Sequence, residues 1–142
     1  IRFDPCWTQE AVLVVNRLHP LASRDEISLK ELMDHYLISY NLTGPLGAEL
    51  TNLVKDYDLT IDCLYSDEIT LASMVVGNPD IMAIACRSWI LDSYDQDVKL
   101  VRILEAPRDF HQMYLCSNAC IAQSKTVTEF VDTALRYCSC LR

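Results

Sequence analysis

Residues 12–32, VLVVNRLHPLASRDEISLKEL, contain an apolar run, a proline stop and the start of a helix. Pro20 has no N–H and disfavours the α region for His19, so a strand that begins at the apolar run must end before them. Ser28 and Glu31 have the spacing of a capping box over a short helix. The stretch therefore predicts a strand, a break at His19-Pro20 and a capped helix.

The composition limits the classes of protein to which the chain can belong. Its 142 residues are enough for one ordinary core, and no segment has the roughly 20 consecutive apolar residues of a membrane span. The formal charge of −8 argues against nucleic-acid binding by these residues, since phosphate contacts need clustered Lys and Arg. The first residues have no signal-peptide pattern and no Met, so we expect an internal fragment of a longer cytoplasmic protein.

The chain contains seven cysteines, which is an odd number with spacings that fit no common disulfide or zinc pattern. A reduced, cytoplasmic setting is the simpler interpretation, and we expect neither a bound metal nor a cofactor. The cysteines are Cys6, Cys63, Cys86, Cys116, Cys120, Cys138 and Cys140.

Hydrophobic periodicity predicts the order of the elements. Strands are predicted at 10–16, 36–40, 59–64, 80–86, 98–104 and 111–117, and helices at 28–35, 45–57, 66–77 and from 126 onward, with a short helix or turn at 87–93. Ser66 is expected to cap the third of these helices, and Thr126 with Glu129 to form a capping box on the last. Strands that alternate with helices of about ten residues indicate parallel βαβ units, so the expected class is α/β with a mostly parallel sheet flanked by helices.

The ordered set of a hydrophobic strand, His19-Pro20-Leu21-Ala22, a charged spacer and the Ser-Leu-x-x-Leu helix from Ser28 resembles the effector-binding domain of LysR-type transcriptional regulators. The resemblance continues through the loop 40–44, the strand and acidic turn at 61–68, the strands 81–85 and 111–117 and the C-terminal helix. It departs at Gly77-Asn78-Pro79-Asp80 and at Cys86-Arg87, where the family usually has a Gly-hydrophobic-Gly segment and often a Pro, so the cleft edge near Cys86 is expected to differ.

This resemblance implies two α/β lobes joined by crossing strands, as in type II solute-binding proteins, with a small effector between them. Residues 1–21 would be the end of the first lobe and a crossing strand, 22–122 the second lobe, and 123–142 the return crossing and a C-terminal helix of the first lobe. The rest of the first lobe and a helix-turn-helix domain would precede Ile1. The implied partners are a small-molecule effector, further copies of the protein in a dimer or tetramer, and DNA only through the domain outside this chain, with no membrane.

Ligands of parallel α/β sheets bind beyond the carboxyl ends of the strands, which here are the loops 41–44, 65–67 and 86–88. The resemblance implies effector contacts in the same loops. The candidate residues are Asn41, Thr43, Gly44, Tyr65, Ser66, Asp67 and Arg87, and His19 and Pro20 are candidate hinge residues.

Each candidate also has a structural interpretation. Thr43 and Ser66 could be simple helix caps, Asn41 a turn residue, and Tyr65 a cover over the sheet edge. Asp67 could serve the helix dipole, and an acidic side chain in the cleft would disfavour a dicarboxylate effector. Arg87 is the cation placed for a carboxylate, or it forms a surface ion pair.

The expected function is sensing of a small molecule by a regulatory domain of a LysR-type transcription factor. The first alternative is a cysteine-based redox sensor of the same fold, through Cys116 with Cys120 or Cys138 with Cys140, and the second is a stand-alone solute-binding module. An enzyme is not expected, because the three histidines lie in different elements. The candidate for cysteine catalysis would be Cys86 beside Arg87.

Overall fold

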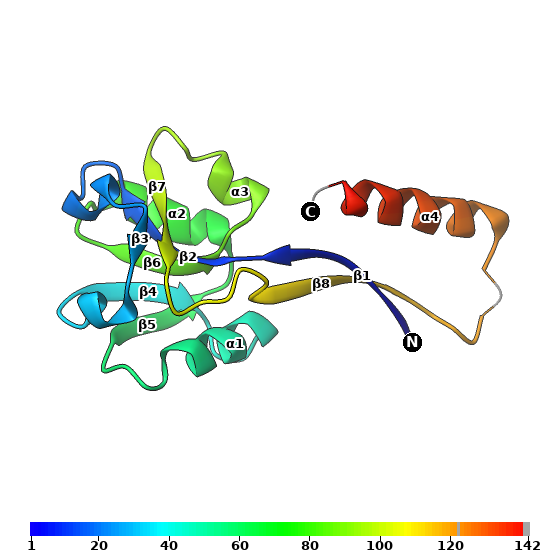
Figure 1. Ribbon diagram of the computed structural model, residues 1–142, viewed down its shortest axis with the longest axis horizontal. Helices are drawn as coiled ribbons and strands as arrows, with labels where there is room; N and C mark the ends of the chain where they lie inside the picture. The colour runs from blue at the N-terminus through cyan, green and yellow to red at the C-terminus, as the bar shows by residue number, and fades with distance from the viewer. Residues whose placement is uncertain (122, 141–142) are drawn as a thin grey trace.

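The computed structural model describes residues 1–121 and 123–140. The predicted end of the second lobe at residue 122 and the last two residues of the predicted C-terminal segment lie outside this range. Figure 1 shows a main lobe around a sheet, a two-stranded ribbon that leaves the lobe, and a separate C-terminal helix alongside the ribbon. Among the described helices, none is long and apolar enough to cross a membrane.

The main lobe is organised around a six-stranded sheet in which five strands run in one direction. Its spatial order is β3 (Glu26–Ile27), β7 (Val98–Ile103), β2 (Ala11–Asn16), β6 (Met82–Cys86), β4 (Tyr36–Tyr40) and β5 (Thr60–Tyr65). Only β2 is antiparallel to its neighbours, β6 and β7. The described pairs β3–β7, β4–β5 and β4–β6 are parallel, which confirms the predicted α/β class and the mostly parallel sheet.

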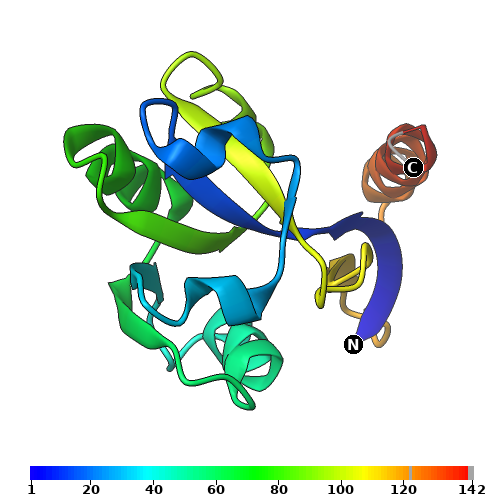
Figure 2. The same cartoon turned by 60° about the vertical axis from the view of Figure 1, so that its left-hand side comes forward.

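The central strand β2 is buried at every position, as expected for a short continuous apolar run with both faces covered. Helix α1 (Pro45–Val54) connects β4 to β5, and α2 (Glu68–Gly77) connects β5 to β6. The chain steps outward from β4 to β5 and then back past β4 to β6. Right-handed crossovers therefore place the two helices on opposite faces of the sheet, and Figure 2 shows them well separated.

The short elements of the main lobe differ in part from the prediction. The predicted helix 28–35 is a single 3-10 turn, η2 (Leu29–Leu32), although its capping box between Ser28 and Glu31 is confirmed. A second 3-10 turn, η1 (Pro20–Ser23), follows the proline stop. The predicted helix or turn at 87–93 is the short helix α3 (Trp89–Asp92).

The ribbon consists of β1 (Arg2–Gln9) and β8 (His111–Ser117), which pair antiparallel and form a sheet of their own. Strand β1 was not predicted, since its residues are mostly exposed, show no alternation of apolar and polar side chains, and include Pro5. It continues directly into β2, so the chain passes from ribbon to main sheet at residues 9–11. The expected boundary between residues 21 and 22 therefore does not match the sheet topology, because β2 lies at the centre of the main lobe.

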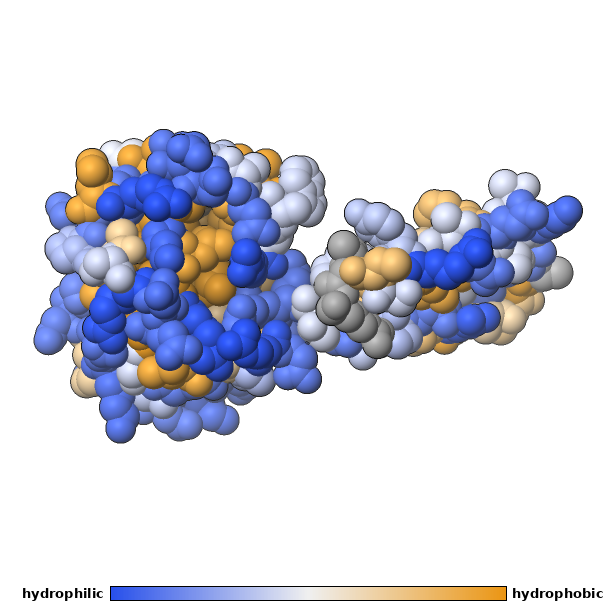
Figure 3. Space-filling view, turned by 45° about the horizontal axis from the view of Figure 1, so that its top comes forward, coloured by the Kyte–Doolittle hydropathy of each residue, from blue (hydrophilic) through white to orange (hydrophobic). Residues whose placement is uncertain are grey.

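The C-terminal helix α4 (Lys125–Ser139) packs against β1. Its N-cap is Ser124, whose side chain accepts a hydrogen bond from the N–H of Val127, so the predicted capping box of Thr126 and Glu129 is wrong. Figure 3 shows α4 and the main lobe as two separate bulks joined by a narrow neck. Phe130 and Tyr137 of α4 are mostly exposed, so its apolar residues are covered on one side only.

Candidate effector site

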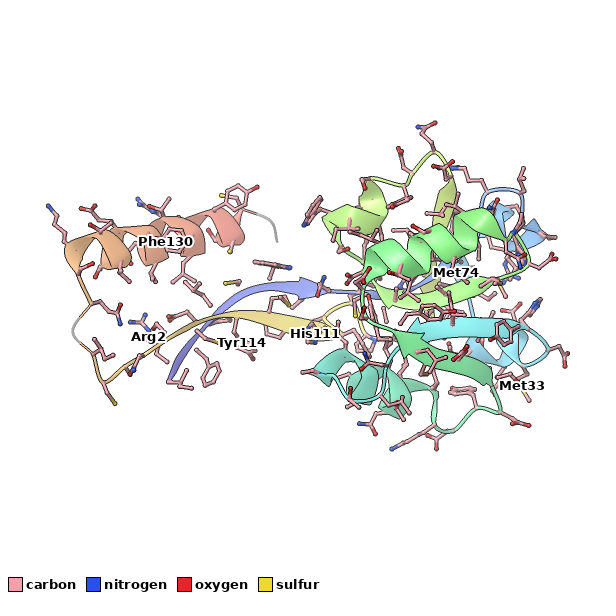
Figure 4. All side chains as sticks on the ribbon, turned by 180° about the vertical axis from the view of Figure 1, so that it is seen from behind. Arg2, Met33, Met74, His111, Tyr114 and Phe130 are labelled. Atoms are coloured by element: carbon pink, nitrogen blue, oxygen red, sulfur yellow. The ribbon has the colours of Figure 1, made fainter. Side chains whose placement is uncertain are left out.

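A cavity of about 410 Å³ opens at the edge of the sheet where β4 and β5 end and the ribbon begins. Figure 4 shows the labelled His111 at this junction between lobe and ribbon. The cavity is therefore bounded by two loops, two helix starts and both ribbon strands. Its lining residues are Gln9, Tyr40, Asn41, Gly44, Pro45, Leu46, Gly47, Ser66, Glu68, His111 and Met113.

The start of α1 presents free backbone donors to this cavity. Gly44 is the N-cap and makes no side-chain capping bond, and Pro45 at the first helical position has no N–H. The N–H groups of Leu46 and Gly47 belong to the first turn, where intrahelical partners are lacking. An uncapped helix N-terminus attracts negatively charged or electron-rich ligand groups.

Gly47 allows the loop 41–44 to pack tightly against α1. A Cβ at this position would lie 2.0 Å from the carbonyl oxygen of Asn41 and 2.9 Å from its carbonyl carbon. Both are backbone atoms, so no rotamer change could relieve the overlap. The loop is also held from its other side, because the N–H of Asn41 donates to the carbonyl of Tyr65 at 2.8 Å.

The start of α2 is organised by Asp67 rather than by Ser66, so the predicted cap is wrong by one residue. The Asp67 carboxylate accepts a hydrogen bond from the N–H of Thr70 at 2.8 Å, and the Ser66 hydroxyl donates to it at 3.0 Å. The bond from the Thr70 N–H is the largest cause that lowers the pKa of Asp67, with further contributions from the Ser66 and Thr70 hydroxyls. Asp67 therefore serves the helix, and Ser66 supports it from the cavity wall.

Glu68 and Tyr40 connect the cavity to the core. The Tyr40 hydroxyl donates to Glu68 Oε1 at 2.9 Å and accepts from the N–H of Cys86 at 3.2 Å. Burial, followed by the negative charge of Glu68, raises the pKa of Tyr40 above its ordinary value. The phenol is therefore a fixed neutral donor that orients the carboxylate of Glu68 at the cavity wall.

His111 joins the ribbon to α1. Its Nδ1 lies 2.7 Å from Glu49 Oε2, and its side chain is mostly buried. His111 opens β8, whereas Glu49 lies one turn into α1. This contact fixes the start of the ribbon next to the helix whose N-terminus faces the cavity.

The structure brings together three of the seven predicted contact residues. Asn41, Gly44 and Ser66 line the cavity, while Thr43, Tyr65, Asp67 and Arg87 are not among the residues that line it. The Thr43 hydroxyl donates to Asn41 Oδ1 at 2.8 Å, so Thr43 supports the loop but does not cap α1.

Arg87 forms the surface ion pair that the structural interpretation predicted. Its Nη2 lies 3.1 Å from Asp92 Oδ1, and both side chains are about half exposed. Arg87 is not among the residues that line the cavity, so it is not placed there as a cation for a carboxylate.

Sequence reasoning missed several lining residues, chiefly Gln9, Tyr40, Glu68, His111 and Met113. Glu68 carried a signal, because it is the first helical residue after a strand that ends at the ligand edge of a parallel sheet. Gln9 and Met113 carried no local signal. They reach the cavity because β1 and β8 pair with each other over a sequence separation of about a hundred residues.

His19 and Pro20 lie at the other end of β2 from the ribbon. His19 Nδ1 accepts a hydrogen bond from the N–H of Leu21 at 3.1 Å, so it caps η1, and Pro20 begins that turn. The chain crosses between lobe and ribbon at 9–11 and near Phe110, not at this corner. The position of these two residues is therefore at odds with the expected hinge.

The site offers no activated thiol at Cys86. This side chain is buried, and burial raises the pKa of the thiol to about 12, with smaller contributions from Glu49 and Glu68. Arg87 points to Asp92 and does not stabilise a thiolate. Within residues 1–121 and 123–140, no three His, Cys, Asp or Glu side chains are grouped so that they could hold a metal ion.

The fold and the cavity define an α/β binding domain of the periplasmic-binding-protein-like type, and the sequence matches the LysR substrate binding domain over residues 1–139. The chain belongs to this family. No curated protein sequence matches the chain significantly.

Solved structures of similar fold include regulatory domains with bound small molecules. The effector binding domain of QuiR in complex with shikimate is 29% identical, with a TM-score of 0.76, over 97% of this chain and 65% of that one. The Synechocystis PCC6803 CcmR regulatory domain in complex with 2-PG is 15% identical, with a TM-score of 0.77, over 96% and 66% of the two chains. HinK, a LysR family transcriptional regulator from Pseudomonas aeruginosa, is 16% identical, with a TM-score of 0.76, over 99% and 49%. The chain thus spans about two thirds or less of these relatives.

Proposed function

We propose that this chain is part of a ligand-sensing regulatory domain and that its effector binds in the cavity beside the α1 N-terminus. The observation that carries the proposal is the convergence of uncapped N–H groups of α1, the Asn41 amide and the Ser66 hydroxyl on one cavity. Concave sites with a few convergent polar groups are typical of small-molecule binding. The QuiR domain, which is 29% identical, is a complex with shikimate.

The charges of the cavity favour an effector that is neutral or carries a single negative charge. The α1 N-terminus can receive one carboxylate, whereas Glu68 and the nearby Asp67 would repel a second. Asn41, Ser66 and Glu68 supply donors and acceptors suited to hydroxyl groups. A small hydroxylated monocarboxylic acid therefore fits this set of groups best.

The cavity is lined by residues of the ribbon and by residues of the main lobe, and the proposed mechanism depends on this. Gln9, His111 and Met113 belong to the ribbon side, whereas Asn41 and Ser66 belong to the main lobe. A ligand that contacts both sides stabilises the ribbon orientation in which those contacts form. It shifts the population toward that orientation by its difference in affinity for the two arrangements.

In this proposal, effector binding is transmitted by a change in the orientation of the ribbon. That change would control DNA binding and transcription by a separate helix-turn-helix domain. The protein would act as a cytoplasmic dimer or tetramer, with no enzymatic step. A gene that encodes no helix-turn-helix domain upstream of Ile1 would instead support the stand-alone solute-binding module.

Isothermal titration of shikimate into the protein tests this proposal, with tricarballylate, a tricarboxylate of similar size, as the comparison ligand. We expect heat of binding for shikimate and much less for tricarballylate. Asn41→Ala and Ser66→Ala should each weaken binding about 5- to 10-fold, the loss of one net hydrogen bond. Asn52→Ala is the matched control, because Asn52 lies exposed on α1 away from the cavity lining. Tighter binding of tricarballylate, or equal affinity in the Asn41 and Asn52 variants, would contradict the proposed site.

A further inference from the structure

The attachment of α4 to the rest of the molecule runs mainly through β1. Among the described side chains of α4, Cys138 alone is buried, at 6% exposure. Among those of β1, Cys6 alone is buried, at 5% exposure. The centre of the contact between helix and ribbon is therefore formed by two cysteines, which are both free thiols.

The two thiols also lie in the same contact. Helix α4 packs directly on β1, and Cys6 and Cys138 are the described side chains of these two elements that are buried. A disulfide needs Cα atoms about 4.4–6.8 Å apart, a separation that a helix packed on a strand can provide. The two residues are separated by almost the whole chain, so only the packing of α4 on β1 brings them together.

We propose that Cys6 and Cys138 form a reversible disulfide that fastens α4 to β1. This pair differs from both pairs that the sequence suggested. Cys138 and Cys140 are two positions apart at the end of a helix, and such residues point in different directions. Cys116 lies exposed on β8, and Cys120 is exposed in the loop that follows.

The chemistry requires a two-electron oxidant, for which we name hydrogen peroxide. Peroxide oxidises one thiol to a sulfenic acid and releases water, and the second thiol then attacks that sulfur and releases a second water. Two thiols are oxidised to one S–S bond while one peroxide is reduced to two waters. Burial raises the pKa of Cys6 and so keeps its reactive thiolate scarce while α4 is packed. Oxidation should therefore be slow and should follow the opening of α4 from the ribbon.

The test uses the whole chain and maps its disulfides after peroxide treatment. Free thiols are alkylated, the protein is digested with trypsin without reductant, and the peptides are identified by mass spectrometry. Cys6 is the only cysteine in the tryptic peptide 3–17, whereas Cys138 shares its peptide with Cys140. Cys140→Ser is therefore the background in which the bond is assigned, and Cys116→Ser is the matched control with an exposed cysteine removed.

We expect the peptide with Cys6 to be linked to the peptide with Cys138 in the wild type, in Cys140→Ser and in Cys116→Ser. Dithiothreitol should release the link. Hydrogen exchange of the α4 amides should slow at least 10-fold in the oxidised form, and this change should be absent in Cys6→Ser.

Seven free thiols after prolonged peroxide treatment would overturn the proposal, and so would a dominant disulfide between any other two cysteines. Because the mapping uses the wild type, the result stands even if Cys6→Ser fails to fold. It is also independent of effector binding.

Discussion

Single residues decide how closely the backbone can approach the cavity. Gly47 shows this best, because its missing side chain leaves room for the carbonyl group of Asn41. The loop that carries Asn41 can then lie against α1, whose first-turn residues Leu46 and Gly47 line the same cavity. The geometry of the site therefore depends on the lack of a Cβ at Gly47 as well as on its polar groups.

Gly47→Ala should lower the free energy of unfolding by about 1–3 kcal/mol, since the new Cβ overlaps backbone atoms and the loop must shift. Urea denaturation followed by circular dichroism measures this change. The matched control is Gly77→Ala at the end of α2, where a Cβ meets no atom within 4 Å. That variant should be as stable as the wild type or slightly more stable, by up to about 1 kcal/mol. Equal losses in the two variants would show that the close approach at Asn41 is not what Gly47 provides.

At the scale of elements, the places of α1, α2 and α4 were predictable, but the residues that cap α2 and α4 were not. The sequence offers neighbouring residues that can all cap, such as Ser66 with Asp67, or Ser124 with Thr126. Which one becomes the N-cap depends on where the preceding loop turns into the helix, and that path is set by tertiary contacts. For the cavity, the consequence is that Asp67 caps α2 while Ser66 is one of the residues that line the cavity wall.

Asp67→Ala should destabilise the protein at neutral pH, because α2 loses its cap while its buried face, with Leu71 and Val75, still has to fold. Hydrogen bonds lower the pKa of Asp67 in the folded state below the ordinary value of 3.8. Its stabilisation is therefore complete above the unfolded-state pKa and is lost as the pH falls through the folded-state pKa. The urea midpoints of wild type and variant should differ at neutral pH and converge in acid.

Ser66→Ala is the control for this prediction, since it removes one hydrogen bond to the Asp67 carboxylate and leaves the cap in place. Its destabilisation at neutral pH should be smaller than that of Asp67→Ala. A larger effect of the serine substitution would mean that Ser66 is the true cap.

At the scale of the whole molecule, the main lobe carries the core and the ribbon carries α4. The buried cluster is built from β2, β4, β6 and β7 with α2, whereas the residues of α4 are mostly exposed. The cavity lies where these two parts meet, so a ligand there can report on their relative orientation.

A chain that ends after Ser117 should therefore keep the cooperative unfolding of the main lobe. The removed helix α4 contacts mainly β1, so we expect the urea midpoint to stay close to that of the full chain while the helical signal falls. Leu13→Ala, at a fully buried position of β2, is the contrasting variant and should cost about 2–5 kcal/mol. Loss of the cooperative transition in the shortened chain would show that α4 supports the main lobe more than its contacts suggest.

The sequence by itself determined the α/β class, the parallel βαβ core and the strand before His19-Pro20, because these depend on local periodicity and on turn residues. It also predicted that Asn41, Gly44 and Ser66 lie at one edge of the sheet, where they line the same cavity, since parallel strands end together. Only the tertiary structure decided that β1 pairs with β8, that Gln9 and Met113 reach the cavity, and that Cys6 and Cys138 are both buried where α4 packs on β1. These contacts join segments about a hundred residues apart, and their energy comes from the partner strand or helix, which no local window of the sequence contains.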